Sequence, residues 1–323
     1  MKPFFKANII EKNPEIIGVC HPHWRGIRSA TYSLTANVFE VPEIQTLLRA
    51  KKVAEEILKY QPKKIILSGY PCGYDLLAKS LKEQRPAVRI FFLSHTPFTW
   101  YTERFDETSW LEKMLNAHKS GYIEKVGFAK EAAALYFKEK GVNAFFVMNR
   151  PGKYDKTKRI PNLKNPQIGV WGSHMWHRNL VNQVLAGLMV ENSQIHMNEL
   201  PEYFFIDKER VKRHGVLSKE EYIPLLRSMD INLYISFTDC FPMTVIESMS
   251  CGIPCITSDT SGIYNWSDYL KDMLVESKID NPVAIRDRIK KVFKNYSRIK
   301  KEIAVYLPIL YGKIDQSLVE FLK

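Results

Sequence analysis

Two carboxylates bracket the expected start of one helix, and their types and spacing favour chemistry on a sugar phosphate. Asp239 lies in the loop after an apolar run of strand length at residues 231–236, and Glu247 lies in the first turn of a helix expected at about 244–251. Gly252 follows, where a left-handed cap costs least. A helix start attracts phosphate through its unpaired N–H groups and its dipole, and carboxylates beside it can accept hydrogen bonds from sugar hydroxyls.

The same residues allow a second interpretation. In a capping box, the Thr244 hydroxyl and the Glu247 carboxylate would each accept a hydrogen bond from a backbone N–H group of the first turn. Both side chains would then serve only to close the helix start. The spacing alone leaves the ligand site and the capping box open.

Length and composition indicate a globular protein of two domains. The chain has 323 residues, of which 45% are hydrophobic, and this supports two cores at roughly 150 residues per domain. The cysteines are odd in number, scattered and without a Cys-x-x-Cys pair: Cys20, Cys72, Cys240, Cys251 and Cys255. We expect neither a disulfide framework nor a zinc site, and reduced thiols in the cytoplasm are the simplest interpretation.

The sequence predicts no segment that spans a membrane. The first residues lack the apolar core of a signal peptide, and no run of about 18 uncharged apolar residues occurs. We therefore expect a cytoplasmic protein.

The net charge of +12 comes from 47 Lys and Arg against 35 Asp and Glu. Part of it crowds into one C-terminal cluster: Arg286, Arg288, Lys290, Lys291, Lys294, Arg298, Lys300 and Lys301. A solvated helix face is the default interpretation of this basic cluster, and an anionic membrane surface is the next. Nucleic acid is not expected as a partner, because no basic strand face with interleaved aromatic residues is seen.

Strands and helices alternate through the first half of the chain. We expect strands at residues 16–20, 64–68, 88–93, 123–127 and 144–148, and helices at 41–60, 74–84, 109–118 and 129–140. This alternation predicts a parallel sheet with helices packed on it, a Rossmann-like domain at residues 1–152. Ligands of such sheets bind where strands end. A loop with Arg25, Gly26 and Arg28 follows the first of these strands, and His95 follows the third.

The second half repeats the pattern after a linker. Residues 153–165 are charged, contain proline and have no apolar periodicity, so we expect the linker there. Strands follow at residues 167–171, 231–236 and 253–257, with helices between them. The helix that begins at Ser218 has Glu221 three residues on, which predicts a capping box. Residues 166–302 are therefore expected to form a second Rossmann-like domain.

The stretch from Ser236 to Gly262 resembles the signature of family-4 retaining glycosyltransferases (glycosyl transferases group 1), which have the GT-B fold. In that signature an acid, seven residues and a Glu precede a small-residue helix, then Gly-x-Pro and a strand. These positions are Asp239, Glu247, Gly252 and Pro254 here. The family usually has Glu at the first of them, so Asp239 is one methylene shorter. The resemblance implies two Rossmann-like domains whose sheets face a cleft, with residues 303–323 as a helix that returns to the first domain.

Further positions match the family's pattern. The family has a glycine followed six residues later by a basic residue that binds the diphosphate. These positions are Gly172 and Arg178 here, and the planar guanidinium of arginine can hold phosphate through two hydrogen bonds. Ser173 stands where the family often has a second basic residue. The loop at Gly215 corresponds to one whose backbone usually faces the nucleotide base. In the first domain, Gly26 matches the glycine of a loop that approaches the donor phosphate.

The resemblance implies roles for the matched residues in a retaining transfer. His95 and Asp239 would contact the donor sugar, and Glu247 would hold the ribose. The helix start would stabilise the departing diphosphate, so its neighbours are predicted to bind the donor: Phe241, Pro242, Met243, Thr244 and Val245. The leaving phosphate itself would accept the proton of the acceptor hydroxyl.

We expect no metal ion and no cofactor beyond the nucleotide sugar itself. His174, His177 and His196 raise the question of a metal, but no carboxylate or Cys stands at ligand spacing from them. Metal-dependent sugar transferases usually need an Asp-x-Asp pair, and the sequence has none. The diphosphate would then be neutralised by the helix dipole and arginine.

The partners implied by the resemblance are a nucleotide-sugar donor, with UDP or GDP, and a glycan or lipid-linked acceptor. The pathway implied is synthesis of cell-surface polysaccharide, lipopolysaccharide or glycolipid, at the inner face of the plasma membrane if the basic cluster binds lipid. Two alternatives stay open: a weak or inactive sugar-nucleotide-binding relative, and a GT-B epimerase that acts on the nucleotide sugar alone.

Overall fold

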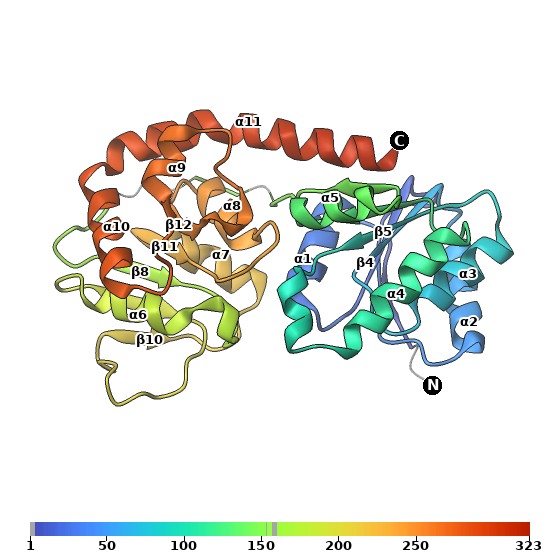
Figure 1. Cartoon of the computed structure of the whole chain (residues 1–323), viewed down its shortest axis with the longest axis horizontal. Coiled ribbons are helices and arrows are strands. Elements are labelled where there is room, and N and C mark those ends of the chain that lie inside the picture. The colour runs from blue at the N-terminus through green and yellow to red at the C-terminus, as the bar shows by residue number, and fades with distance from the viewer. Residues whose placement is uncertain (1–3, 153, 157–159) are drawn as a thin grey trace. The chain divides into compact units, whose positions relative to one another are not determined.

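The protein folds into two units (Figure 1). The computed structural model describes residues 4–152, 154–156 and 160–323, so residues 153 and 157–159 of the predicted linker lie outside the described residues. Unit 1 comprises Met1–Arg150 with Ile314–Lys323, and unit 2 comprises Pro151–Lys313. The other residues of the predicted linker thus group with unit 2, and the last residues of the chain group with unit 1.

Among the described residues, unit 1 contains a seven-stranded sheet. Its order is β1-β3-β2-β4-β5-β6-β7, and its neighbours are parallel except for β1 and β3. The strands are β1 (Lys6–Asn8), β2 (Ile16–Cys20), β3 (Val38–Glu40), β4 (Lys64–Ser68), β5 (Arg89–Ser94), β6 (Lys125–Phe128) and β7 (Ala144–Phe146). Most of them are buried apolar runs, as expected of a parallel sheet covered on both faces.

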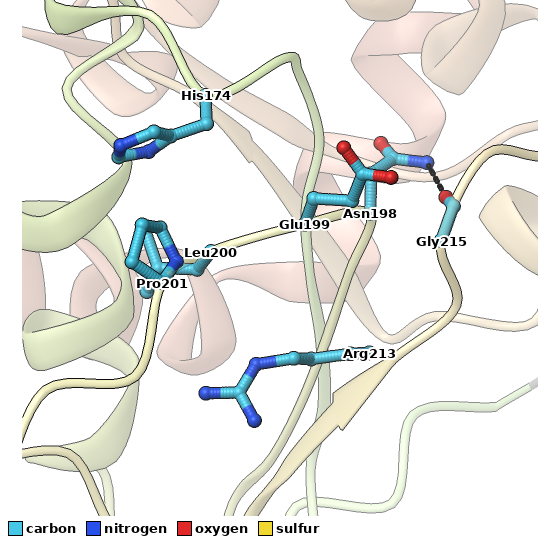
Figure 2. Close-up of a pocket in the computed structure, with 7 residues that line it drawn as sticks. All are labelled: His174, Asn198, Glu199, Leu200, Pro201, Arg213 and Gly215. Atoms are coloured by element: carbon cyan, nitrogen blue, oxygen red, sulfur yellow. Dashed lines mark hydrogen bonds between the residues drawn. The ribbon is translucent and has the colours of Figure 1, made fainter.

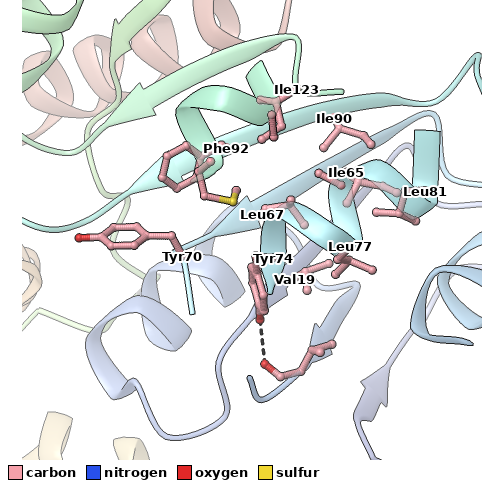
Figure 3. Packing of buried hydrophobic residues seen from close by; sticks show 14 of the residues in the cluster. Val19, Ile65, Leu67, Tyr70, Tyr74, Leu77, Leu81, Ile90, Phe92 and Ile123 are labelled. Atoms are coloured by element: carbon pink, nitrogen blue, oxygen red, sulfur yellow. Dashed lines mark hydrogen bonds between the residues drawn. The ribbon is translucent and has the colours of Figure 1, made fainter. Parts of the chain in front are cut away.

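Helices of unit 1 pack on this sheet and form its core. They are α1 (Arg25–Leu34), α2 (Leu47–Leu58), α3 (Tyr74–Gln84), η1 (Phe98–Thr102), α4 (Asp106–Lys119), α5 (Glu131–Glu139) and the end of α11 (Tyr296–Leu322). Because side chains alternate along a strand, Ile65 and Leu67 belong to the larger core that includes α3 (Figure 3), while Ile66 belongs to a second cluster with Phe321 of α11.

Unit 2 is a second open sheet, with six strands in the part of the chain that is described, all parallel to their neighbours. The order is β10-β9-β8-β11-β12-β13. The strands are β8 (Gln167–Val170), β9 (Gln194–Met197), β10 (Val211–Arg213), β11 (Ile231–Tyr234), β12 (Cys255–Ser258) and β13 (Val275–Glu276). Its helices are η2 (Trp176–Arg178), α6 (Leu180–Leu188), α7 (Lys219–Arg227), α8 (Met243–Ser250), η3 (Asp259–Ser261), α9 (Asp268–Leu274), α10 (Pro282–Lys294) and the larger part of α11.

The predicted pair of parallel α/β units is confirmed, and several elements match closely. Helix α3 and strand β4 have the predicted bounds. Gly252 follows α8 with φ of +78°, and its N–H group donates to the Met249 carbonyl at 2.8 Å, so it is the predicted left-handed residue at the end of the helix. The capping box of Ser218 and Glu221 is also present at the start of α7.

The predicted helix at residues 41–60 is wrong at its start. Helix α2 begins only at Leu47, and Thr46 caps it by accepting a hydrogen bond from the Arg49 N–H at 3.3 Å. Residues 41–46 form neither helix nor strand and connect β3 to α2. Pro42 disfavours helical backbone at Val41, the predicted start.

Asn232 fixes the centre of the unit 2 sheet. It is fully buried on β11, where its Oδ1 accepts a hydrogen bond from Trp171 Nε1 at 2.6 Å. Its Nδ2 donates to Ser248 Oγ of α8 at 2.8 Å and to the Leu226 carbonyl of α7 at 3.2 Å. One amide therefore joins the end of β8 to the two helices that carry site residues.

Replacing Asn232 should destabilise unit 2 strongly. Asn232→Ala leaves the buried Trp171 N–H group without its partner and opens a cavity, so we expect unfolding free energy to fall by about 3 kcal/mol. Urea denaturation followed by circular dichroism measures this. Asn265→Ala, at an exposed asparagine, is the matched control and should cost little. Equal midpoints for both variants would contradict the assigned role.

Candidate functional site

Helix α8 starts after the loop that follows β11, where the sequence predicted the chemistry. Pro242 is the N-cap residue, and no described side chain caps the helix. Thr244 lies inside the first turn, and its hydroxyl accepts a hydrogen bond from Tyr222 at 3.3 Å. Glu247 forms an ion pair with a lysine of another helix. The capping-box interpretation of Thr244 and Glu247 is therefore wrong.

Asp239 lies in a half-buried polar cluster beside the start of α8. Its Oδ2 accepts hydrogen bonds from the Tyr234 hydroxyl at 2.6 Å and from Arg178, and its Oδ1 accepts from the Cys240 N–H at 2.7 Å. Burial opposes ionisation of Asp239, but the guanidinium charge of Arg178 and these hydrogen bonds lower its pKa below the ordinary value of an aspartate. The carboxylate is therefore charged and fixed in position at neutral pH.

Arg178 reaches Asp239 from η2, the turn that follows β8. Its guanidinium also donates to the Tyr234 hydroxyl and lies 5.2 Å from that ring's centroid. Gly172 is adjacent, because a Cβ added to it would lie 3.6 Å from Arg178 Cγ. Ser173, beside Gly172, is exposed. The six-residue spacing thus brings glycine and arginine together, and the arginine is engaged with the carboxylate.

Glu247 is buried, with 2% of its side chain exposed, and its partner is Lys219. Lys219 is the first residue of α7, and its ammonium also lies 5.7 Å from the ring centroid of Tyr154. Burial raises the pKa of Glu247, and the positive charge of Lys219 opposes that rise. A cation thus holds each of the two predicted carboxylates beside the start of α8.

The remaining predicted donor residues of α8 differ in exposure. Phe241 and Val245 are buried, with 1% and 0% of each residue exposed, so their side chains cannot meet a ligand. Met243 and Thr244 are half-buried. A ligand at this helix start would therefore meet mainly backbone N–H groups and the two ion pairs.

A pocket of about 380 Å³ opens at the carboxyl ends of β8, β9 and β10 (Figure 2). It is lined by Asn198, Glu199, Leu200 and Pro201 after β9 and by His174, Arg213 and Gly215. Asn198 connects the three strand ends, because its Nδ2 donates to the Gly215 carbonyl at 3.1 Å and its Oδ1 accepts from the Gly172 N–H at 3.4 Å. The predicted donor residues Gly172 and Gly215 are thus tied to one preformed pocket.

Gly26 belongs to unit 1, and its predicted place in a loop is wrong. It is the second residue of α1, because the turn after β2 is short and the Arg28 N–H already donates to the Trp24 carbonyl at 2.8 Å. A Cβ at Gly26 would meet nothing within 4 Å, so the backbone there does not require glycine. Its part in phosphate binding stays a prediction.

His95 also belongs to unit 1, directly after β5. Its Nε2 lies 3.0 Å from Ser68 Oγ at the end of β4. Burial lowers the pKa of His95 to about 4, against the opposite effect of a hydrogen bond with Asn149. The imidazole is therefore neutral at pH 7, and its contact with a donor sugar stays a prediction.

The three histidines considered as metal ligands have separate environments. His196 is half of a pair, with its Nδ1 3.0 Å from Nε2 of His214. His177 is buried, and burial together with the charge of Arg178 lowers its pKa to about 4. His174 lines the pocket. Among the residues that the structure describes, no group of three or more His, Cys, Asp or Glu side chains could hold a metal ion.

Part of the basic cluster is paired within unit 2. Lys291 lies 3.0 Å from Asp272, and Arg288 lies 3.1 Å from Glu276. Arg298 stacks over a tyrosine ring. These contacts use part of the cluster's charge, and binding of the cluster to a membrane surface stays a prediction. No described helix is both long enough and apolar enough to cross a bilayer.

Comparison with solved structures first defines the fold. The chain is similar to a glycosyltransferase from Rickettsia africae ESF-5 (TM-score 0.63, 13% identity, 97% of this chain and 100% of that one). It is also similar to an α,α-trehalose-phosphate synthase (UDP-forming) from Burkholderia xenovorans (TM-score 0.64, 10% identity, 95% and 100%). A putative UDP-N-acetylglucosamine 2-epimerase from Listeria monocytogenes is a third (TM-score 0.57, 10% identity, 91% of each). The fold is GT-B, as predicted.

Comparison with protein families then indicates which class of enzymes the sequence resembles. Residues 177–295 match the family described as Glycosyl transferases group 1. The match begins next to Arg178 and contains Asp239 and Glu247, and it confirms the resemblance seen in the sequence. Comparison with curated proteins found no match. The family match and the fold together support a glycosyltransferase of the GT-B fold.

Three residues of the site escaped the sequence prediction. Lys219 looked like one of many surface lysines, although its place at the start of a capped helix was a usable signal. Tyr234 ended a predicted strand and gave no sign of a polar partner. Asn198 follows β9, a strand that was not among those predicted by range. Each became visible only when the fold brought distant segments together.

Removing Lys219 should destabilise the protein in a pH-dependent way. Lys219→Met leaves Glu247 buried without its cation, and we expect a loss of about 2 kcal/mol at pH 8, reduced because water partly screens the lysine. Since burial raises the pKa of Glu247, the loss should shrink as the pH falls and the carboxyl takes up a proton. Denaturation curves between pH 8 and pH 5 measure it.

Two further variants sharpen this test. Adding Glu247→Gln to Lys219→Met removes the unpaired charge and should restore most of the stability. Lys208→Met breaks an exposed pair with Glu202 and should have little effect at any pH. A loss in Lys219→Met that does not vary with pH would argue that the lysine acts through packing alone.

His95 should stay neutral as the pH falls through the ordinary histidine range. The expected midpoint is about pH 4, because burial disfavours the imidazolium form. NMR titration of the imidazole Hε1 signal, assigned by its disappearance in His95→Gln, measures the midpoint. A midpoint near 6.5 would mean that the ring is open to solvent.

Proposed function

We propose that the protein is a retaining, metal-independent glycosyltransferase that moves a sugar from a nucleotide-diphosphate sugar to an acceptor hydroxyl. One observation carries the proposal: the start of α8 has a carboxylate–cation pair beside it in Asp239–Arg178 and another in Glu247–Lys219. All four residues fall within the segment that matches the group 1 family. The arrangement supplies positive groups for a diphosphate and carboxylates for sugar and ribose hydroxyls.

In this mechanism the diphosphate binds at the N-terminus of α8. The helix dipole and the amide groups of Thr244 and Val245 face the phosphate, and Arg178 turns part of its fork toward it. Asp239 keeps the hydrogen bond from Tyr234. The carboxylate lone pairs that accepted from Arg178 become available to the hydroxyls of the sugar. The ion pair thereby holds Arg178 and Asp239 near the positions in which they would bind the donor.

Glu247 takes the ribose hydroxyls. A carboxylate is the better acceptor when ionised, yet burial favours its protonated form. Lys219 opposes that effect and keeps the charged form available. The buried pair therefore serves recognition of the ribose rather than stability alone.

Transfer proceeds with retention because the leaving group and the incoming hydroxyl share one face of the sugar. The bond from the anomeric carbon to the diphosphate oxygen breaks, the bond to the acceptor oxygen forms, and the leaving phosphate accepts the acceptor's proton. Stabilising negative charge on the diphosphate supplies most of the rate. His95, neutral at pH 7, is the candidate for contact with the donor sugar.

The acceptor side of the proposal rests on the resemblance alone. A glycan or lipid-linked acceptor and a pathway to cell-surface polysaccharide, lipopolysaccharide or glycolipid follow from it. We propose a place in the cytoplasm, at the inner membrane face if the basic cluster binds lipid. The alternative is an epimerase, which the similarity to a putative UDP-N-acetylglucosamine 2-epimerase keeps open. An epimerase would change the nucleotide sugar with no acceptor present.

The test is donor binding, measured by thermal unfolding with UDP-, GDP-, ADP- and CDP-sugars. A donor at about 100 times its Kd should add roughly 2.7 kcal/mol to the stability of the folded protein. Glu247→Ala should remove the shift. The double variant Arg178→Gln with Asp239→Asn should remove it as well, and it leaves neither charge buried alone. NMR of the reaction product then reports the anomeric configuration.

Arg286→Ala is the control, because Arg286 pairs with Asp287 on α10, far along the chain from the donor residues. It should keep the full shift. A cooperative melt that no nucleotide sugar moves would end the transferase proposal. An inverted product would end retention while leaving transfer intact.

A further inference from the structure

The pocket beside Asn198 has features that the proposed mechanism does not use. Its volume of about 380 Å³ lies within the range of small-ligand sites. Leu200, which is buried, and Pro201 give it an apolar wall on which a flat ring can lie. It opens where three parallel strands end, the edge at which open α/β sheets bind ligands.

Two side chains of opposite charge line this pocket. Glu199 has no hydrogen-bond or ion-pair partner among the described residues, although its carboxylate can accept two hydrogen bonds at once. Within the described part of the chain, the one ion pair of Arg213, at the end of β10, is a loose contact of 4.0 Å with Glu202. Figure 2 shows the two side chains reaching the pocket from different strand ends. A carboxylate and a guanidinium are thus both available to one ligand.

The frame that carries these charges is fixed. Asn198 is hydrogen-bonded to the backbone at both Gly172 and Gly215, and the Gly215 N–H donates to the Asn198 carbonyl at 2.9 Å. Gly215 has a φ of +65°, a conformation that favours glycine. Glu199 follows this anchor directly, and Arg213 precedes Gly215 by two residues. These hydrogen bonds fix the backbone that frames the pocket.

We propose that this pocket selects a guanine base, so that the donor is a GDP-sugar; the inference rests on the proposed function and names its nucleotide. Guanine presents two adjacent donors, N1–H and the N2 amino group, which match the two oxygens of the Glu199 carboxylate. It also presents two adjacent acceptors, O6 and N7, which match the fork of Arg213. The flat face of the purine lies on Leu200 and Pro201.

The other common bases fit these charges less well. Uracil has one N–H donor between two carbonyls, so one carboxylate oxygen stays unpaired. Adenine has an amino donor but no carbonyl for the guanidinium, and cytosine has no N–H beside its amino group. Each of these bases therefore forms fewer charge-assisted hydrogen bonds with Glu199 and Arg213 than guanine does, and this difference is what separates the bases.

Calorimetric titration of the whole protein with GDP and IDP tests the proposal directly. IDP differs from GDP only in lacking the N2 amino group, so the ratio of their Kd values isolates one contact of Glu199. Wild type should bind GDP about tenfold tighter than IDP. Glu199→Gln should reduce that ratio to near one. Arg213→Gln should weaken both nucleotides about equally and leave the ratio unchanged, because both carry O6 and N7.

Glu202→Gln is the matched control, an exposed carboxylate on the same loop, and it should keep the wild-type ratio. Equal binding of GDP and IDP by wild type, or tighter binding of UDP or ADP, overturns the guanine assignment while the transferase proposal survives. If the Arg178→Gln, Asp239→Asn variant loses nucleotide binding in either of these outcomes, the transferase proposal stands and only the guanine assignment fails. If wild type binds no nucleoside diphosphate at all, both proposals fail together.

Discussion

The candidate site at the start of α8 depends on one constraint: each carboxylate that the fold withdraws from water there must have a cation. Asp239 and Glu247 serve a polar ligand only while ionised, and burial works against ionisation. The positive charges of Arg178 and Lys219 favour the ionised carboxylates, and neighbouring elements position both cations. The turn after β8 brings the arginine, the capped start of α7 brings the lysine, and buried Asn232 holds α7 and α8 against the sheet.

Much of the fold could be predicted because its signals are local. Apolar runs of strand length alternating with helices gave both parallel sheets, and Gly252 and Ser218 marked helix boundaries through their own conformational preferences. Errors arose where a local signal was weak. Strand β3 has three residues and includes a buried Glu40, so its pairing with β2 is decided by the sheet rather than by its own sequence.

The site was harder, because its contacts join segments far apart in the chain. Asp239 and Glu247 could be proposed from spacing, but their partners lie 61 and 28 residues away. The choice between a capping box and an ion pair at Glu247 cannot be made from residues 244–247 alone, since Thr244 and Glu247 suit both. The structural role of Asn198 depends on hydrogen bonds to two backbone groups, at Gly172 and Gly215, which are distant from it in the chain.

The anchoring of Asn198 separates the pocket's frame from its lining. The amide fixes the chain where β9 ends, and the sheet resumes at β10, so residues between these points are held at both ends by bonds that do not involve them. Substitutions or insertions in that loop can therefore change what the pocket accepts without disturbing strand order or α8. Under the proposed function, recognition of the nucleotide base can therefore change while the residues proposed to bind the diphosphate and the sugar stay the same.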